Sequence, residues 1–232
     1  MPDIAIINRS TVLKDDQVAP IVAALQKQVL NDFAPIWGLD ARLEFFGSKK
    51  KAPKNAWWLT VFDNSDQADA LGYHDISPAG KPLGKAFAKS DLDSGLEPST
   101  TISHELLEML ADPDINLAAQ VDELIYAYEV CDPCEADDFG YRIDGVLVSD
   151  FVTPEWFAPT AKVAGPYDFR KKIAKPLGLL HGGYLQYLDL RSSGGWQQVQ
   201  AQKALSRARA RVGSRRERRR TPRAEWQVST GR

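Results

Sequence analysis

With 232 residues, of which 44% are apolar, the chain can bury a full core in one domain, or in one domain that carries a tail. No apolar run approaches the length of a membrane span, and two cysteines do not make a disulfide framework, so the composition argues against membrane-spanning and disulfide-rich secreted proteins. The start of the chain lacks a basic leader and a long apolar segment, so we expect no signal peptide and a cytoplasmic location.

The net charge of −2 at pH 7 conceals a marked asymmetry. Residues 203–232 hold one lysine and ten arginines against two glutamates, a net charge of +9, whereas residues 1–202 carry a net charge of −11. A run of arginines of this kind can bind the phosphate backbone of nucleic acids non-specifically. It contains few apolar side chains, so a solvated, flexible tail without such a partner is an equal alternative.

Apolar runs separated by turn residues predict alternating strands and helices in the first part of the chain. We expect strands over Ile4–Ile7, Ala41–Phe46 and Trp57–Phe62, a helix over Val18–Phe33, a polar loop over Asp63–Asp75 and a further strand over Gly80–Ser90. Glycine and proline in the last of these segments favour a position at the edge of a sheet rather than at its centre.

The stretch Thr100–Asp112 predicts a helix that ends before Pro113, because a residue that precedes proline disfavours helical geometry. Its apolar residues occupy one broad face. The opposite face is narrow and polar, and it consists of Thr101, His104, Glu105, Glu108 and Asp112. His104 and Glu108 are four residues apart, so both side chains can reach one point in space, and Glu105 projects along the same rim.

This arrangement suits a metal-activated water. Two ligands lie on consecutive turns of one helix, and a third carboxylate is placed to accept a proton. An ordinary amphipathic surface helix with a solvated charged face would show the same pattern, so the sequence leaves both interpretations open.

The segment His104–Glu108, His-Glu-Leu-Leu-Glu, resembles His-Glu-x-x-His, the signature of the zincin metallopeptidases, with glutamate in place of the second histidine. The resemblance implies an α+β fold with a mixed sheet, whose edge strand lies over the active-site helix and pairs with an extended peptide substrate. Gly80–Ser90 would be that strand. The resemblance also implies that His104 and Glu108 bind zinc and that Glu105 is the general base. A glutamate ligand shifts the preference toward harder ions such as manganese.

The second half of the chain has a weaker pattern. We expect a helix over Asn116–Leu124, strands over Tyr126–Asp132 and Tyr141–Phe151, and a loop region with one or two short strands over Pro166–Gln197. Residues 1–115 would form a zincin-like N-terminal subdomain with the metal-site helix. Residues 116–202 would form a mostly β and loop subdomain that completes the cleft, and residues 203–232 would form the basic tail.

A catalytic metal needs a third protein ligand. Glu129 is the first candidate, because its spacing from Glu108 is similar to that of the third ligand in the thermolysin-like zincins. Asp114 occupies the position that the metzincin branch uses, and Asp132 and Glu135 are further candidates. For each of them a solvated loop carboxylate is the alternative.

Two further features lie outside the helix. Tyr73 and His74 could each donate a hydrogen bond to an oxyanion in the cleft, as zincins often arrange, although an ordinary surface histidine is the alternative for His74. Cys131 and Cys134 form a lone Cys-x-x-Cys pair without a second pair of metal ligands at zinc-finger spacing, so we expect two reduced thiols in a turn.

Three segments also resemble uncharacterised bacterial and phage proteins: Ser-His-Glu-Leu-Leu-Glu-Met-Leu, Tyr-Glu-Val-Cys-Asp-Pro and Phe-Val-Thr-Pro-Glu-Trp-Phe. This second resemblance implies no particular activity. The leading hypothesis is a metal-dependent hydrolase, a peptidase that acts on a peptide or protein substrate with zinc or manganese. The alternative is a non-catalytic scaffold of zincin shape, such as a phage or prophage assembly component, that contacts nucleic acid through its arginine-rich tail.

Overall fold

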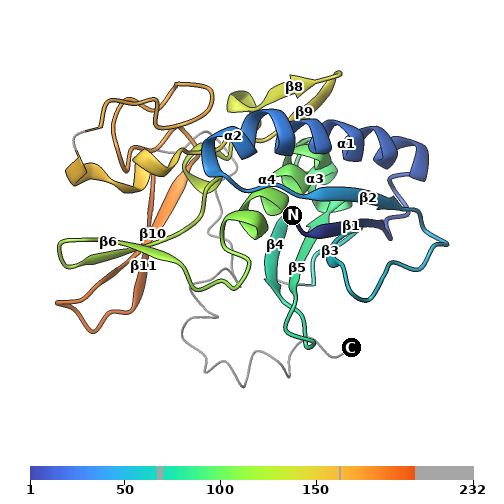
Figure 1. Ribbon diagram of the computed structural model, residues 1–232, viewed down its shortest axis with the longest axis horizontal. Helices are drawn as coiled ribbons and strands as arrows, with labels where there is room; N and C mark the ends of the chain where they lie inside the picture. The colour runs from blue at the N-terminus through green and yellow to red at the C-terminus, as the bar shows by residue number, and fades with distance from the viewer. Residues whose placement is uncertain (67–69, 162, 202–232) are drawn as a thin grey trace.

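The computed structural model describes residues 1–66, 70–161 and 163–201, and its fold is α+β (Figure 1). The strands of these residues form a five-stranded mixed sheet, a four-stranded antiparallel sheet and a two-stranded hairpin. The α+β class predicted from the sequence is therefore confirmed. The arginine-rich segment 203–232 lies outside the described residues.

The five-stranded sheet is built from the first part of the chain and carries one antiparallel strand at its edge. Its strands are β1 (Asp3–Asn8), β2 (Arg42–Phe46), β3 (Trp57–Phe62), β4 (Gly72–Ile76) and β5 (Pro82–Phe87). Their order is β2-β1-β3-β5-β4, in which only β4 runs antiparallel to its neighbour. The first three strands confirm the strands predicted for this part of the chain.

The edge of this sheet differs from the prediction. The sequence places an edge strand within Gly80–Ser90, but β5 in this segment pairs on both sides, with β3 and with β4. Gly84 suits this interior position, because a Cβ there would lie 3.0 Å from Cγ of Leu59 on β3. The edge strand is instead β4, whose first four residues, Gly72–Asp75, belong to the segment that the sequence predicts as a polar loop.

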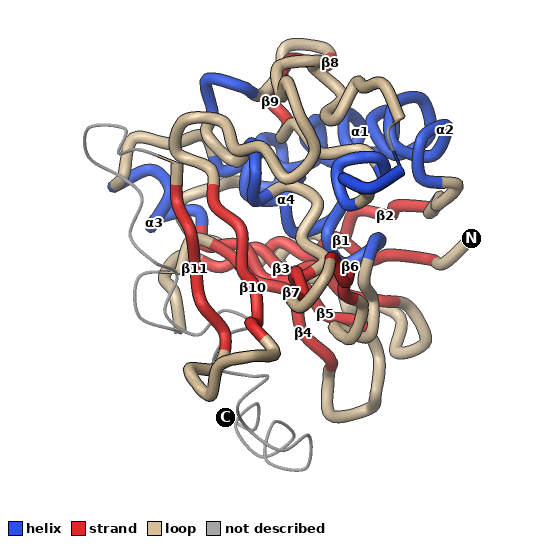
Figure 2. Tube along the Cα trace, turned by 90° about the vertical axis from the view of Figure 1, so that its left-hand side faces the viewer, coloured by secondary structure: helices blue, strands red, loops and turns tan. Residues whose placement is uncertain are grey.

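Helices cover one face of the five-stranded sheet, and the main core lies between the helices and the strands (Figure 2). The two longest helices are α1 (Asp15–Lys27) and α4 (Pro98–Ala111), and both contribute to this core. From the sheet the core takes the side chains of Ile4, Ile6, Leu59, Val61 and Ala86. The alternate residues of β1, Ala5 and Ile7, face a smaller cluster on the other side.

The helix predicted over Val18–Phe33 is confirmed, although its geometry changes along its length. After α1 the chain continues as a π-helical segment, η1 (Gln28–Phe33), and then as α2 (Ala34–Trp37). Gly38 ends α2 with a left-handed backbone conformation (φ 68°), which glycine adopts without strain.

Gln28, the first residue of η1, joins three segments of the core through a ring of hydrogen bonds. Its Oε1 accepts a hydrogen bond from Ser103 Oγ on α4 (2.8 Å), and its Nε2 donates to the carbonyl oxygen of Ser149 (2.9 Å). The backbone N–H of Ser149 closes the ring by donating to Ser103 Oγ (3.0 Å). Ser103, the member of this ring on α4, directly precedes His104. The ring therefore fixes the rotation of α4 about its axis.

The central helix is confirmed, but its polar face is not exposed. α4 ends at Ala111 with Asp112 as its C-cap, before Pro113 as predicted, and all fourteen of its residues are buried. The helix contacts β4 and β5 of the sheet on one side and the hairpin strand β9 (Val146–Val148) on the other. The alternative of an ordinary surface helix with a solvated charged face is therefore wrong.

The second half of the chain departs further from the prediction. Its four-stranded sheet has the order β11-β10-β7-β6, with β6 (Ala118–Val121), β7 (Leu124–Ala127), β10 (Tyr184–Asp189) and β11 (Trp196–Gln200). The helix predicted over Asn116–Leu124 is wrong, because Asp122 takes a positive φ of 51° and turns the chain into the β6–β7 hairpin. The strand predicted over Tyr126–Asp132 stops at Ala127.

The segment Tyr141–Phe151, predicted as one strand, is a hairpin of β8 (Tyr141–Ile143) and β9, with Asp144 and Gly145 at positive φ in its turn. The remaining short elements are α3 (Ala88–Asp93) and the 3₁₀ turns η2 (Asp132–Cys134), η3 (Asp137–Phe139), η4 (Pro154–Phe157) and η5 (Pro159–Ala161). None of the helices in the described part of the chain has the length and apolar character that a bilayer span requires.

The buried carboxyl groups of Asp150 and Asp168 lie side by side and link two loops, one of which follows β9. Asp150 Oδ1 accepts hydrogen bonds from the backbone N–H groups of Phe151 (2.8 Å) and Arg170 (3.2 Å), while the carboxyl of Asp168 lies beside it. Burial, together with the hydrogen bond and the negative charge of Asp168, raises the pKa of Asp150 from 3.8 to about 8. The buried site thus favours the protonated form of Asp150 in the folded protein.

This raised pKa predicts a pH-dependent stability. Protonated Asp150 contributes its full stabilisation below pH 3.8, and this contribution is lost as the pH rises to about 8, because the unfolded chain releases the proton first. In the wild type this loss lowers the free energy of unfolding by at most roughly 1.4 kcal/mol per pH unit. In Asp150→Asn the decline with pH should be smaller. Urea unfolding between pH 4 and pH 8 measures this slope. The exposed carboxylate variant Asp138→Asn is the control, and an equal slope in both variants would contradict the assignment.

Candidate metal centre

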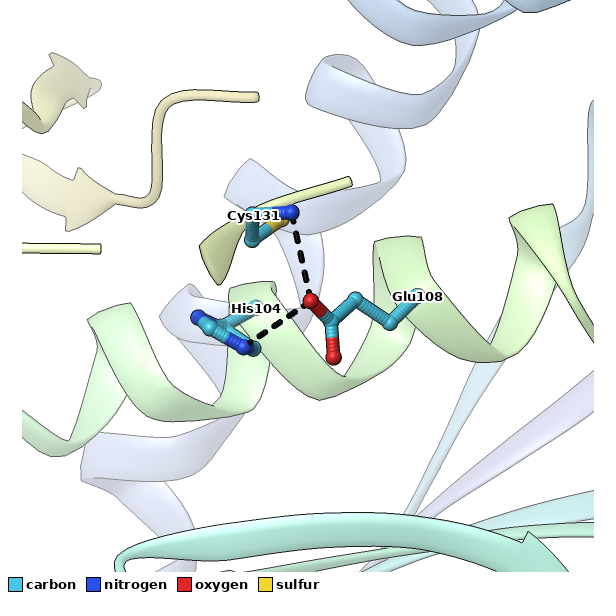
Figure 3. Close-up of side chains that lie close together, drawn as sticks. All are labelled: His104, Glu108 and Cys131. Atoms are coloured by element: carbon cyan, nitrogen blue, oxygen red, sulfur yellow. Dashed lines mark hydrogen bonds and ion pairs between the residues drawn. The ribbon is translucent and has the colours of Figure 1, made fainter. Parts of the chain in front are cut away.

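The centre of the candidate site is the pair His104 and Glu108 on adjacent turns of α4. His104 Nε2 lies 3.2 Å from Glu108 Oε1 (Figure 3). The same carboxylate oxygen accepts a hydrogen bond from the backbone N–H of Cys131 (3.2 Å), which fixes its orientation toward the imidazole. Both side chains are buried, with exposed fractions of 2% and 3%, so these two groups lie together inside the protein.

The segment after β7 brings further carboxylates to this pair. Asp132 Oδ1 lies 3.2 Å from His104 Nε2. Oxygen atoms of Glu129, Asp132 and Glu108 lie within 4.8 Å of one another, and Glu135 forms a similar group with His104 and Asp132. Two of the predicted third ligands, Glu129 and Asp132, are therefore next to the helix pair, and both are buried.

Asp114, the remaining alternative ligand, is placed elsewhere. It follows the end of α4, its side chain is exposed, and it belongs to none of the ligand groups found among the described residues. The chain turns sharply here, since Ile115 has a positive φ of 52° and the carboxylate of Asp112 accepts hydrogen bonds from two backbone N–H groups that follow. The structure thus does not support Asp114 as a ligand.

The spacing of these groups fits a divalent cation. Ligand atoms around a tetrahedral zinc, at bond lengths of about 2.1 Å, lie about 3.4 Å apart. The two separations from His104 Nε2, each 3.2 Å, are close to this value. One imidazole with several carboxylates is a ligand set that suits zinc or manganese. His104 forms two groups that could hold such an ion, one with Glu108 and Cys131 and one with Asp132 and Glu135, while Glu129 is grouped with Glu108 and Asp132.

The sheet adds a second histidine to the site. His74 lies on β4, not in a loop, and only 4% of its side chain is exposed. Its Nδ1 is 3.6 Å from Glu108 Oε2 and 3.7 Å from Glu105 Oε2. Helix α4 comes this close to β4 because Gly72 has no side chain: a Cβ there would lie 2.6 Å from Glu105 Oε1.

Tyr73, the other predicted oxyanion donor, points away from this cluster. Neighbouring residues of a strand face opposite sides of the sheet. The Tyr73 hydroxyl lies 3.0 Å from both carboxylate oxygens of Asp66, and its ring packs against Phe87. The strand therefore brings His74 to α4 and leaves Tyr73 on the other face.

Cys131 and Cys134 are reduced and buried, as predicted for this turn. Burial, and in second place the charge of Glu108, raises the pKa of the Cys131 thiol, so this side chain is not a reactive thiolate on its own. Its Sγ nevertheless lies in one group with ligand atoms of His104 and Glu108. No motif in the sequence predicts this proximity. The one related signal is that Cys131 lies next to Asp132 and two residues after Glu129, both of which were candidate ligands.

Comparison with known protein families, with curated proteins and with solved structures gives no match for this chain. The likeness to the zincin fold thus stays a prediction from the His104–Glu108 motif.

The ligand set predicts that His104→Ala removes the cation. Metal content, measured by mass spectrometry after loading with zinc or manganese and gel filtration, should fall by one equivalent relative to the wild type. The exposed His181 is the matched control, and His181→Ala should keep the cation. Because a cation that binds only the folded state stabilises it, a chelator should lower the Tm of the loaded wild type more than that of loaded His104→Ala. Unchanged metal content in His104→Ala would exclude this site.

The contact at Gly72 generates a second prediction. In Gly72→Ala the new methyl group would overlap the carboxylate of Glu105 and the side chain of Thr101, and relieving such an overlap costs about 1–3 kcal/mol. Chemical denaturation should show this loss in the free energy of unfolding. Gly194→Ala, in an exposed turn where the nearest atom would be 3.1 Å away, is the control. An equally small effect in both variants would mean that α4 and β4 are not held as closely as described.

Proposed function

We propose that this chain is a metal-dependent hydrolase that cleaves peptide bonds. The observation that supports it is that His104 Nε2 lies 3.2 Å from both Glu108 Oε1 and Asp132 Oδ1, with Glu105 next to His104 on α4. Zinc-type hydrolases use such a set, in which protein ligands are combined with a nearby carboxylate that handles the proton.

Each side chain of the site has a separate role in the proposed reaction. His104 and Glu108, with Asp132 or Glu129 as the third ligand, would hold the cation. When bound, the ion would supply Lewis-acid chemistry: it polarises a carbonyl and makes a water molecule more acidic. Glu105 accepts the proton from the attacking water and passes it to the leaving amine. Its carboxylate lies so close to β4 at Gly72 that a Cβ there would be only 2.6 Å from Glu105 Oε1.

The position of β4 favours an extended peptide as the substrate. β4 is the edge strand of the five-stranded sheet, and it runs directly beside α4. An extended chain can add to the edge of a sheet through backbone hydrogen bonds, which gives affinity without a demand for particular side chains. This role, which the sequence analysis assigned to Gly80–Ser90, is now proposed for β4.

A second function is favoured by the burial of the ligands. The exposed fractions of His104, Glu105 and Glu108 are only 1–3%, and those of Asp132 and Glu129 are 2% and 7%. Closed sites of this kind are typical of structural ions, whereas catalytic sites keep one position open to water. A non-catalytic scaffold, such as a phage or prophage assembly component with a structural ion, is therefore the alternative. Nucleic-acid contact through residues 203–232 would belong to this alternative.

The variant Glu105→Gln tests the catalytic proposal. It should keep the cation at the His104 position but lose peptide hydrolysis by roughly 10²–10⁴-fold, since the amide cannot accept the proton. Hydrolysis of a mixed peptide library is measured in the presence of zinc, manganese or cobalt, with a chelator as a blank. Glu123→Gln, at an exposed carboxylate, is the control for the substitution itself.

Two outcomes would contradict the proposal. Full activity in Glu105→Gln would remove Glu105 from the reaction. A wild type that binds the cation stoichiometrically but hydrolyses no peptide with any of the three metals would instead support the structural-ion alternative.

A further inference from the structure

We propose that the chain binds a second divalent cation between β4 and α4, through His74, Glu105 and Glu108. Glu108 would bridge the two cations, with Oε1 on the side of His104 and Oε2 on the side of His74. The ligands are one imidazole and two carboxylates, which suit a first-row divalent ion such as manganese or zinc. The second position extends the proposed function, because it shares Glu108 with the first.

The distances between ligand atoms in this second group are closer to those around a shared metal ion than to those of direct hydrogen bonds. His74 Nδ1 lies 3.6 Å from Glu108 Oε2 and 3.7 Å from Glu105 Oε2. Hydrogen bonds between nitrogen and oxygen are normally 2.7–3.2 Å long, whereas ligand atoms that share a tetrahedral ion lie about 3.4 Å apart. Ligand atoms of all three side chains lie within 4.8 Å of one another.

The charges at the site also favour more than one cation. Four carboxylates, those of Glu105, Glu108, Glu129 and Asp132, are buried with exposed fractions of 1–7%. Collecting four carboxyl groups away from water is costly, and a second divalent cation beside Glu105 and Glu108 would offset part of this cost.

The orientation of Glu108 supports a bridge rather than two competing positions. Its two oxygens face different histidines, and the backbone N–H of Cys131 holds the one on the His104 side. Carboxylate-bridged pairs of metal ions are typically about 3.5–4 Å apart. If Glu105 is the proton acceptor of the proposed function, the second cation would occupy the same carboxylate. Excess metal would then compete with proton transfer.

Cation stoichiometry tests this proposal without any assay of activity. Chelator-treated full-length protein is titrated calorimetrically with manganese chloride, and the metal content is measured after gel filtration. The wild type should bind two equivalents and His74→Gln only one. Tyr73→Phe is the matched control, because Tyr73 is the next residue of β4 and faces the other side of the sheet; it should bind two equivalents.

Electron paramagnetic resonance of the manganese-loaded wild type provides a test that needs no variant. Two ions bridged by one carboxylate should give a spin-coupled signal once the second equivalent has been added. A spectrum of isolated ions at that point would overturn the bridge, even if His74→Gln failed to fold.

The remaining outcomes separate this inference from the proposed function. One equivalent in the wild type and one in His74→Gln would overturn the second position and leave the first intact. Two equivalents in both proteins would also overturn it. No bound cation at all would overturn both proposals. Two coupled ions would support the second position, and the hydrolase is then tested with one equivalent of metal: absence of peptide hydrolysis at one equivalent would contradict it.

Discussion

The burial of a polar helix rim is the constraint on which this structure depends. α4 carries His104, Glu105 and Glu108, yet it is enclosed by the sheet on one side and by the β8–β9 hairpin on the other. Ionisable groups removed from water destabilise the fold unless other groups compensate them. The surroundings supply such groups from both sides: His74 from β4, and the backbone N–H of Cys131 from the segment after β7. An apolar helix would not need these partners. The placement of β4 and of the segment after β7 is therefore linked to the polar residues of α4.

The parts of the fold that follow from local rules could be predicted from the sequence. The helix that includes Val18–Lys27, the end of α4 before Pro113 and the apolar strands β1 and β3 are all set by neighbouring residues, although α1 begins three residues earlier than predicted, at Asp15. The pairing of His104 with Glu108 also follows from helical spacing alone. Glu129 and Asp132 were reached only through a resemblance, and their place beside Glu108 depends on how the segment after β7 folds back.

The parts that could not be predicted depend on contacts between distant segments. β4 reads as a loop because Gly72, His74 and Asp75 are poor strand formers, and their burial is explained only by the proximity of α4. The β6–β7 hairpin was missed because its turn rests on a positive φ at Asp122, which nothing in the neighbouring sequence required. Patterns of polarity assume that polar residues face water, and this assumption fails where polar residues face one another.

The hydrogen-bonded ring of Gln28, Ser103 and Ser149 sets the angle at which α4 presents its imidazole. None of its members belongs to the cluster around His104, yet a change in any of them would turn the helix relative to both the sheet and the segment after β7. Selection acting on a glutamine in a distant π-helical turn could thus shift His104 and Glu108 without replacing either of them. Any chemistry of this cluster could then vary among related chains for reasons that lie outside the cluster itself.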